Sequence, residues 1–319
     1  MKSKLSAILK ISVSGILLYF ISKQIEWSQV VTSVKNGYPS QLIIGVLLGC
    51  GFNIVKFIKW HYLIKTEGHD YSFVDGAKSY MIGNCLGMVT PLRAGDLGRA
   101  LYFDNNERPR IMGLTIIDRF IELVAVLILS IAGCFVLLNR GVGFMVVVLA
   151  AAGLAFLYTA GILHSVLKRI MPVGRVGEKI MKLIDVLRMF RVKTVSVVLL
   201  LSVVTFVLCI LQFYYLITAF EETTRLSAFL VTPLITLSSI LPVSLMGLGV
   251  REGISIVLFS KFGVSAAAAL SAAFLFFLIN NLSISVIGIF FLSKIKIKNK
   301  NTDLNCGIYG DRGDAGSIK

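Results

Sequence analysis

Charged residues are scarce in this sequence: Asp, Glu, Lys and Arg make up only 15% of its 319 residues, whereas 56% are hydrophobic. A single soluble core cannot bury that much apolar surface, and the mean hydropathy of +0.84 is typical of a membrane protein. Acidic residues are the scarcer kind, with 17 Asp and Glu against 32 Lys and Arg. The basic residues lie between long apolar segments, a distribution that orients membrane proteins. We therefore predict an all-α polytopic membrane protein and expect no nucleic-acid partner.

Residues that bind metals or nucleotides are also sparse. The five cysteines occur singly and form no CxxC pair, and those in apolar segments are expected to be small buried hydrophobes. The three histidines are isolated near span ends, so no metal site is predicted. The sequence lacks the GxxxxGK[ST] motif, and its GxG at 247–249 follows no strand. No catalytic residue and no cofactor are predicted, so any transport would be downhill or coupled to an ion gradient.

Apolar segments long enough to cross a bilayer recur along the chain. Most Lys and Arg residues fall on one side of the resulting arrangement, which predicts that both termini are cytoplasmic. The second span ends in Lys56, Lys59 and Trp60, which is expected to form a basic and aromatic anchor at the cytoplasmic surface. The six predicted spans are 1–22, 39–60, 113–138, 142–163, 195–219 and 265–292.

Segments outside the spans are short. Residues 24–38 suit an interfacial helix, and the basic segment 164–193 fits either an amphipathic helix on the inner leaflet or a solvated charged face. Residues 299–319 are expected to be a polar disordered tail. The longest of these segments has about 30 residues, too few for a separate catalytic domain. We predict one membrane-embedded domain at 1–298, with halves at about 1–140 and 141–298.

Two apolar runs, 78–99 and 227–259, are broken by glycine and proline and are too irregular for one straight helix. We predict two re-entrant helical hairpins, because broken backbone is tolerated at membrane depth only where protein or a water-filled cavity satisfies its polar groups. Half-helices beginning near Gly95 and Gly249 would direct N–H groups at an anionic head group. The predicted hairpin backbone residues are Gly83, Pro91, Gly95 and Gly98 in the first hairpin and Pro242, Gly247 and Gly249 in the second.

Ionisable residues occur within these apolar segments, where each charge costs about 2.5 to 3.5 kcal/mol or more. On the third span, Asp118 and Glu122 share a face and Arg119 lies one turn from Glu122. Arginine matches the geometry of phosphate, so a lipid head-group site is one interpretation, and a purely structural salt-bridge lattice is the other. Asn84, Asn280 and Asn281 are expected to form hydrogen bonds between helices. The candidate head-group residues are Arg93, Asp96, Arg99, Asp118, Arg119, Glu122, Arg251 and Glu252.

The two hairpins share a short sequence pattern. Both 91–99 and 242–251 contain a proline, then a glycine, then Leu-Gly and an arginine. Each half then holds three spans and one hairpin, so the second half is inverted relative to the first. This is the layout of transporter folds whose binding sites form where broken helices meet near the bilayer midplane.

These motifs resemble the lysylphosphatidylglycerol synthase transmembrane family, a flippase-like domain that occurs alone or fused to a synthase. The resemblance covers roughly residues 5–295 and depends on GN-x6-TPLRAGDLGRA at 83–100, DR-x2-E at 118–122 and LPVSLMGLGVREG at 241–253. Leu92 stands where the family has Gly, Asp96 where it has Glu, and Leu245 and Met246 where it has Pro-Gly. The resemblance implies movement of a polar-headed lipid between leaflets by a member without the soluble synthase domain.

The leading hypothesis is a lipid translocase in the cell membrane. Its partner would be an anionic or phosphate-bearing lipid, bound by Arg93 and Arg99 from the cytoplasmic side and by Arg251 from the outer side. The alternatives are a membrane enzyme or enzyme subunit acting on aminoacyl lipids or lipid-linked sugars, and a scaffold that transports nothing. A second copy of the chain and a separate lipid-modifying enzyme are both left open as protein partners.

Overall fold

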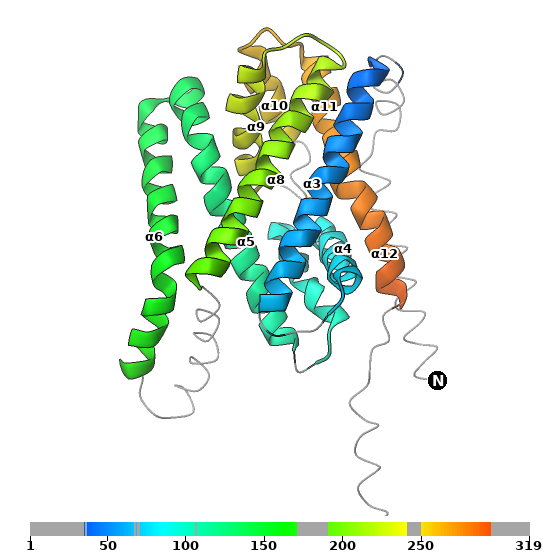
Figure 1. The fold of residues 1–319 in the computed structure, drawn as a ribbon. Coiled ribbons are helices and arrows are strands. Elements are labelled where there is room, and N and C mark those ends of the chain that lie inside the picture. Colours follow the sequence, from blue (N-terminus) through cyan, green and yellow to red (C-terminus); the bar gives the residue numbers. More distant parts are fainter. Residues whose placement is uncertain are drawn as a thin grey trace, which may run out of the picture.

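The structure is a computed structural model that describes residues 37–66, 71–105, 107–170, 191–240 and 250–294, together with residues 35 and 68. Within these residues every regular element is a helix (Figure 1), which confirms the predicted all-α class. The predictions for 1–22, for most of 24–38, for 171–190 of the basic segment and for the tail at 299–319 lie outside the described residues.

Five of the described helices are long and apolar enough to cross a membrane. They coincide with the second to sixth predicted spans, which confirms a polytopic membrane protein. The third begins at Arg108, earlier than predicted. Pro109 lies in its first turn, where backbone N–H groups have no partner within the helix, so the missing N–H of proline costs no hydrogen bond. The five are α3 (Pro39–Thr66), α5 (Arg108–Gly133) with η2 (Cys134–Leu138), α6 (Arg140–Ile170), α8 (Val192–Thr218), and α11 (Ala266–Phe277) with η5 (Leu278–Leu282) and α12 (Ser283–Lys294).

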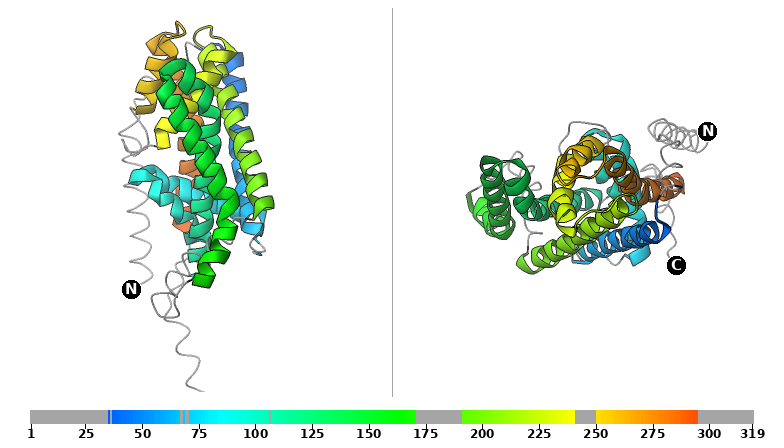
Figure 2. Two further views of the ribbon diagram at one scale, coloured as in Figure 1. Left: turned by 90° about the vertical axis from the view of Figure 1, so that its left-hand side faces the viewer. Right: turned by 90° about the horizontal axis from the view of Figure 1, so that it is seen from above.

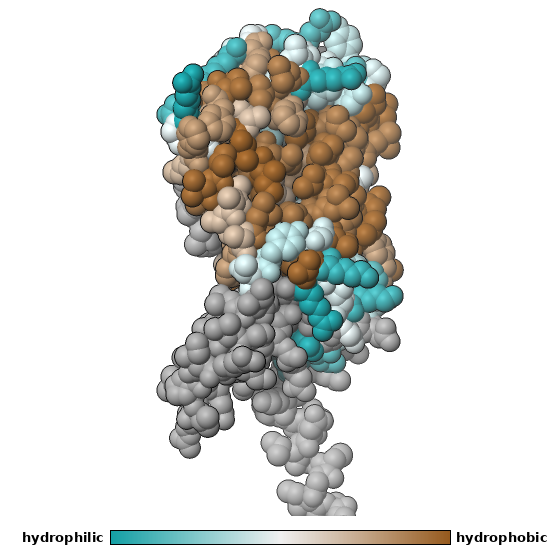
Figure 3. All heavy atoms as spheres, turned by 60° about the vertical axis from the view of Figure 1, so that its left-hand side comes forward, coloured by the Kyte–Doolittle hydropathy of each residue, from teal (hydrophilic) through white to brown (hydrophobic). Residues whose placement is uncertain are grey.

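Large apolar side chains face outward on these helices, among them Ile43, Leu47, Phe144 and Val148. Figure 3 shows a broad hydrophobic band on one face, between hydrophilic residues at the two ends of the molecule. Lipid acyl chains can cover such a band, whereas water cannot. Cys50 is also exposed, so the prediction that it would be buried is wrong, whereas Cys85, Cys134 and Cys209 are buried as predicted.

The first hairpin consists of α4 (Phe73–Val89) and the 3-10 helix η1 (Pro91–Tyr102). Ser72 caps α4 by accepting a hydrogen bond from the Asp75 N–H at 3.2 Å. The chain turns at Thr90, whose backbone is extended, and η1 begins at Pro91. The prediction of a helical hairpin is confirmed, and the hairpin is longer at both ends than the predicted 78–99.

Glycine allows the two arms of this hairpin to pack backbone to backbone. A Cβ on Gly95 would lie 2.2 Å from the carbonyl group of Leu86 on α4, and one on Gly83 would lie 2.3 Å from Cγ of Arg99 on η1. A side chain at either position would force the arms apart. The predicted role of Gly83 and Gly95 in the hairpin backbone therefore has a steric cause, whereas a Cβ on Gly98 would meet only the end of the Leu86 side chain.

The second hairpin has arms α9 (Arg225–Ile240) and α10 (Val250–Ser260). Its predicted tip, with Pro242, Gly247 and Gly249, lies outside the described residues. Figure 1 shows α4 in the half of the molecule opposite to the half that holds α9 and α10. The two hairpins therefore approach the middle of the bundle from opposite ends, as the inverted arrangement predicts.

Each hairpin packs on a spanning helix of the other half. In the first hairpin α4 packs on α12, and in the second α9 packs on α5. Both contacts depend on a glycine against a backbone carbonyl: a Cβ on Gly288 would lie 2.2 Å from the Met81 oxygen, and one on Gly133 would lie 2.2 Å from the Leu230 oxygen. The helices α3 and α8, which occupy equivalent places in the two halves, pack on each other. This exchange of partners joins the two halves into one bundle.

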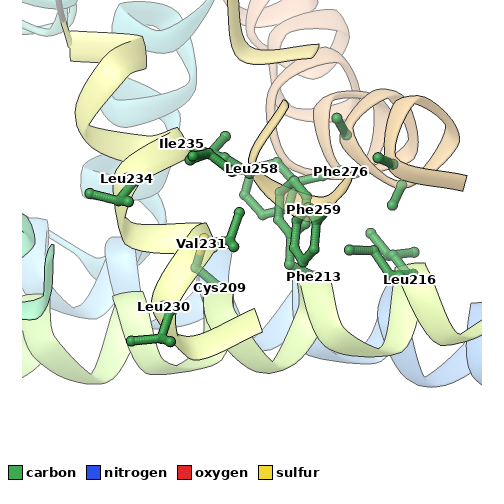
Figure 4. Close-up of a cluster of buried hydrophobic side chains, with 14 of the residues drawn as sticks. Cys209, Phe213, Leu216, Leu230, Val231, Leu234, Ile235, Leu258, Phe259 and Phe276 are labelled. Atoms are coloured by element: carbon green, nitrogen blue, oxygen red, sulfur yellow. The ribbon is translucent and has the colours of Figure 1, made fainter. Parts of the chain in front are cut away.

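A large apolar core holds the second half together. The right-hand view of Figure 2 shows α8, α9, α10 and α11 next to one another, and buried residues of all four belong to this core. Figure 4 shows its centre, where the Phe213 ring of α8 lies 6.3 Å from the Phe259 ring of α10 and 5.0 Å from the Phe276 ring of α11, measured between centroids. Val231 and Ile235 of α9 also belong to the cluster. The polar residues described next lie at the other end of the bundle, around the first hairpin.

Candidate functional site

Three elements bring eight charged side chains together. The helix α3 supplies two lysines, η1 supplies two arginines and an aspartate, and α5 supplies an arginine and two acids. Their ion pairs connect all eight in one network. We call this network the charge cluster, and its members are Lys56, Lys59, Arg93, Asp96, Arg99, Asp118, Arg119 and Glu122.

The centre of the charge cluster is sealed from solvent. The Lys59 Nζ lies 2.8 Å from Oδ1 of Asp118 and 2.6 Å from Oε1 of Glu122. The Arg99 Nη1 donates a hydrogen bond of 2.8 Å to Oδ2 of Asp118. Lys59, Arg99 and Asp118 have no exposed side-chain surface. These two cations and two acids balance each other, and this balance allows the charges to remain at this depth.

Aromatic rings fix the guanidinium of Arg99. Its carbon lies 4.4 Å from the ring centroid of Trp60 and 4.3 Å from that of Tyr80. The Trp60 Nε1 donates to the Ser79 hydroxyl at 3.2 Å, and that hydroxyl is also 3.2 Å from the carbonyl oxygen of Arg99. The sequence predicts that Arg99 binds a lipid head group directly. In this structure it is enclosed and holds Asp118.

The accessible part of the charge cluster is positively charged. The Arg119 Nη1 donates to Oε2 of Glu122 at 2.7 Å, and its Nη2 lies 2.7 Å from Oδ2 of Asp96. The Arg93 Nε lies 3.6 Å from the same oxygen. The side chains of Arg93 and Arg119 are 39% and 26% exposed, whereas that of Asp96 is only 4% exposed. An incoming group therefore meets guanidinium groups first.

The charge cluster has more cations than acids. Three of its eight members are acids and five are cations, and the eight together carry a net charge of +2. Lys56 contributes to this excess, since its Nζ is 3.5 Å from Oε1 of Glu122, an oxygen that also pairs with Lys59. A buried site with surplus positive charge favours an anionic ligand.

Arg93 has an unusual backbone. Its φ is 54°, in the left-handed region, which non-glycine residues occupy rarely and at a cost of about 1 to 3 kcal/mol. The Arg93 Nη2 donates to Oδ1 of Asn84 at 2.8 Å, and Nδ2 of Asn84 donates to the Ser285 hydroxyl at 3.1 Å. The strained residue next to the hairpin turn is therefore held in place from α12 of the other half.

In the second hairpin the candidate residues lie in the first turn of α10. The Arg251 Nη2 lies 2.5 Å from Oε1 of Glu252, and both side chains are largely buried. The Arg251 guanidinium lies 5.1 Å from the ring centroid of Phe277. Phe277 belongs to a buried apolar cluster that also contains Cys85 and Met88 of α4. Arg251 thus lies against a residue of an apolar cluster to which the first hairpin also contributes.

The structure corrects two details of the predicted site. The lysines and Trp60 of α3 are not an interfacial anchor, because Lys59 and Trp60 are fully buried and α3 continues to Thr66. The N–H of Gly95 is not free for a ligand, because η1 begins at Pro91 and this N–H donates to the Thr90 hydroxyl at 2.6 Å. The spacing of Asn53, Lys56 and Lys59 puts them on one face of α3, but this spacing does not by itself show that the face is buried.

The predicted hydrogen bonds between helices are confirmed for the side chains of Asn280 and Asn84, whereas Asn281 takes part only through its backbone carbonyl oxygen. The Asn280 Nδ2 donates to Oε1 of Gln212 at 2.7 Å, and the Asn53 Nδ2 lies 3.4 Å from Oδ1 of Asn280. These contacts link α3, α8 and η5. Asn84 bonds to the carbonyl oxygen of Asn281 at 3.3 Å and also orients Arg93, so it belongs to both the scaffold and the rim of the charge cluster.

Comparison with known protein families gives one match. The family described as "Lysylphosphatidylglycerol synthase TM region" matches residues 7–288. The match includes both hairpins, all eight members of the charge cluster and most of the last spanning helix. A comparison with curated proteins finds no match.

Proposed function

The chain belongs to the lysylphosphatidylglycerol synthase transmembrane family, and from this premise we propose that it moves a polar-headed, phosphate-containing lipid between the leaflets of the membrane. The surplus positive charge of the charge cluster is the observation that carries the proposal. Arg93 and Arg119 are its most accessible cations. A guanidinium binds a phosphate through two parallel hydrogen bonds, so the pair suits the head group of a phospholipid.

The approach of the hairpins from opposite ends supports translocation. A head group that crosses the bilayer must exchange water for protein contacts, and an unpaired phosphate at midplane would be prohibitively costly. Arg93 and Arg119 offer cations near the first hairpin, and Arg251 offers one in the second. We propose that the phosphate is passed between these two sets, with Arg99 holding Asp118 in place.

The orientation in the membrane is part of the proposal. We propose that the protein lies in the cell membrane with both termini in the cytoplasm, and the excess of Lys and Arg on one side supports this orientation. The first hairpin would then open to the cytoplasm and the second to the outer side. A second copy of the chain or a separate lipid-modifying enzyme would be the protein partner.

A second candidate function is suggested by the word synthase in the family's description. The chain would then be a membrane enzyme, or an enzyme subunit, acting on aminoacyl lipids or lipid-linked sugars. This candidate predicts a change in the covalent structure of a lipid, whereas translocation leaves it intact. Mass spectrometry of the lipids before and after incubation with the purified protein distinguishes the two.

The test of translocation uses proteoliposomes with a fluorescent phosphatidylglycerol, whose outward movement is followed by quenching from outside. Arg93→Gln and Arg119→Gln should each slow the movement by about tenfold or more, because each removes a charged hydrogen bond worth about 1.5 to 3 kcal/mol. Arg93→Lys and Arg119→Lys should retain part of the rate, since they keep the charge but lose the two-pronged geometry.

Arg140→Gln is the matched control, because Arg140 is exposed at the start of α6 and lies outside the charge cluster. Its rate should equal that of the unchanged protein. Equal rates in Arg93→Gln, Arg119→Gln and the unchanged protein would rule out a phosphate path through the charge cluster. A fluorescent lipid without phosphate is the second control, and its movement should not respond to any of these changes.

A further inference from the structure

Asp96 is held differently from every other acid in the charge cluster. It is buried on η1 between two arginines, with its Oδ2 at 2.7 Å from Nη2 of Arg119 and 3.6 Å from Nε of Arg93. Neither of its oxygens accepts a directed hydrogen bond from the residues that the structure describes, and Nη2 of Arg119 likewise has no directed acceptor there. The carboxylate of Asp96 and the guanidinium of Arg119 are close to each other, but their angles do not suit a hydrogen bond.

The neighbouring pair between the same two elements is a useful contrast. Arg99 of η1 donates a hydrogen bond of 2.8 Å to Asp118 of α5, and both side chains have no exposed surface. Asp96 and Arg119 join the same elements, but Arg119 is 26% exposed. The ion pair of Arg99 with Asp118 is therefore buried and has hydrogen-bond geometry. The ion pair of Asp96 with Arg119 is partly accessible and lacks that geometry.

We infer that Asp96 is an exchangeable internal anion, which occupies the place of the lipid phosphate in the empty protein and is displaced when the phosphate binds. This inference depends on the proposed function, because it takes a phosphate-bearing head group as the ligand. A phosphate offers more acceptor oxygens than a carboxylate, so it can make directed bonds to Arg93 and Arg119 where Asp96 makes none.

The packing of the hairpin gives the exchange a mechanical result. Asp96 lies against α4 at Gly87, where a Cβ would be 2.4 Å from its Oδ1, and Gly95 lies against the Leu86 carbonyl group. The arms of the hairpin therefore move as one body. When the phosphate takes Arg119, one of the two ion pairs between η1 and α5 is lost. Binding then loosens the hairpin from α5 at its accessible edge, while Arg99 and Asp118 keep the other edge attached.

The test measures affinity with Asp96→Asn, which keeps the shape of the side chain and removes its charge. The purified protein in nanodiscs of zwitterionic lipid is titrated with dihexanoyl-phosphatidylglycerol by calorimetry. Without the competing carboxylate, Asp96→Asn should bind this anionic lipid about fivefold or more tightly than the unchanged protein does, which corresponds to about 1 kcal/mol. Arg119→Gln should change the affinity in the opposite direction.

Asp104→Asn is the matched control, since Asp104 is exposed after the end of η1 and its change should leave the affinity as it was. A parallel titration with inorganic phosphate distinguishes a lipid head group from free phosphate: only the former requires the glycerol ester. A melting curve for each variant shows that it is folded, and Asp96→Ala serves in place of Asp96→Asn if the latter is not.

The outcomes separate the two proposals. If the unchanged protein binds the anionic lipid and Asp96→Asn binds it equally or more weakly, Asp96 is not an exchangeable anion and the proposed function stands. If neither protein binds the anionic lipid, phosphate recognition at the charge cluster is wrong, and the inference about Asp96 fails with it. Tighter binding in Asp96→Asn alone, with weaker binding in Arg119→Gln, supports both.

Discussion

The ammonium nitrogen of Lys59 lies 2.6 Å from Oε1 of Glu122, although the two residues are 63 positions apart in the chain. This contact joins α3 to α5 in a place that solvent does not reach. It lies in the buried centre of the charge cluster, which stabilises the fold. The side chains of Arg93 and Arg119 form the accessible rim of the cluster, where we propose that a ligand binds. The predictions below test this division and the arrangement of the helices around it.

Lys59→Met should destabilise the protein strongly. The change leaves Asp118 with one cation fewer and Glu122 without its closest partner, and breaking a buried ion pair from one side costs about 3 to 5 kcal/mol. Thermal unfolding in detergent measures the loss. Lys65→Met is the control on the last turn of the same helix, where the lysine is exposed. Equal melting temperatures for the two variants would contradict a structural role for Lys59.

Gly133→Ala and Gly288→Ala should each lower the free energy of unfolding by about 1 to 3 kcal/mol, because the added methyl group would lie 2.2 Å from a backbone carbonyl oxygen that cannot turn away. Gly253→Ala is the control within α10, since a Cβ there meets nothing within 4 Å. Its stability should be unchanged or higher. Loss of stability in the control alone would contradict the packing of the hairpins described above.

Asp75→Asn should destabilise the protein at neutral pH and have no effect in strong acid. Hydrogen bonds of 2.6 Å from the hydroxyl groups of Ser72 and Tyr102 hold the pKa of the Asp75 carboxyl below its ordinary value of 3.8. A group with a lowered pKa in the folded state contributes stability above its unfolded pKa, and the contribution is lost as the pH falls through the folded pKa. The difference in melting temperature should therefore shrink below pH 3.8.

Tyr102→Phe removes one of these donors and keeps the acid, so it should show a weaker form of the same pH dependence. A melting difference between Asp75→Asn and the unchanged protein that stayed constant from neutral pH to below 3.8 would show that the charge of Asp75 plays no part.

Single cysteines introduced into a cysteine-free protein should report the orientation of the helices. Position 140 is the first residue of α6 and position 222 lies in the connection after α8, at the same end of the bundle, and both should react with an impermeant reagent added outside sealed right-side-out vesicles. Position 104, in the connection between η1 and α5, should stay protected, as should positions 175 and 298. Labelling of 104 or 175 from outside would reverse the proposed orientation.

Local sequence was sufficient for the hairpins and for the face of α5 that carries the acids. Glycine and proline within an apolar run leave few alternatives to a broken helix, and the spacing of Asp118, Arg119 and Glu122 determines which of them meet, as the 2.7 Å contact of Arg119 with Glu122 confirms. The roles predicted for these residues in lipid binding remain predictions.

The lysines of α3 could not be placed from local sequence in the same way. Lysine and tryptophan at the end of an apolar run fit a membrane interface as well as they fit a buried site. Which of the two applies depends on where the helix ends and on what faces it. The α3 helix continues to Thr66, and the acids that pair with Lys59 come from α5, so the answer required the tertiary packing.

Because each hairpin packs on a helix of the other half, the order in which the helices are made differs from the order in which they can pack. A ribosome makes α4 early and α12 last among the described helices, yet α4 packs on α12, and the Asn84 that orients Arg93 bonds to Ser285. The first hairpin and its charges therefore enter the membrane before the helix that completes their surroundings exists. Until then the insertion machinery, or lipid, must cover the exposed side of α4, so this hairpin is assembled only when translation of the membrane domain is nearly finished.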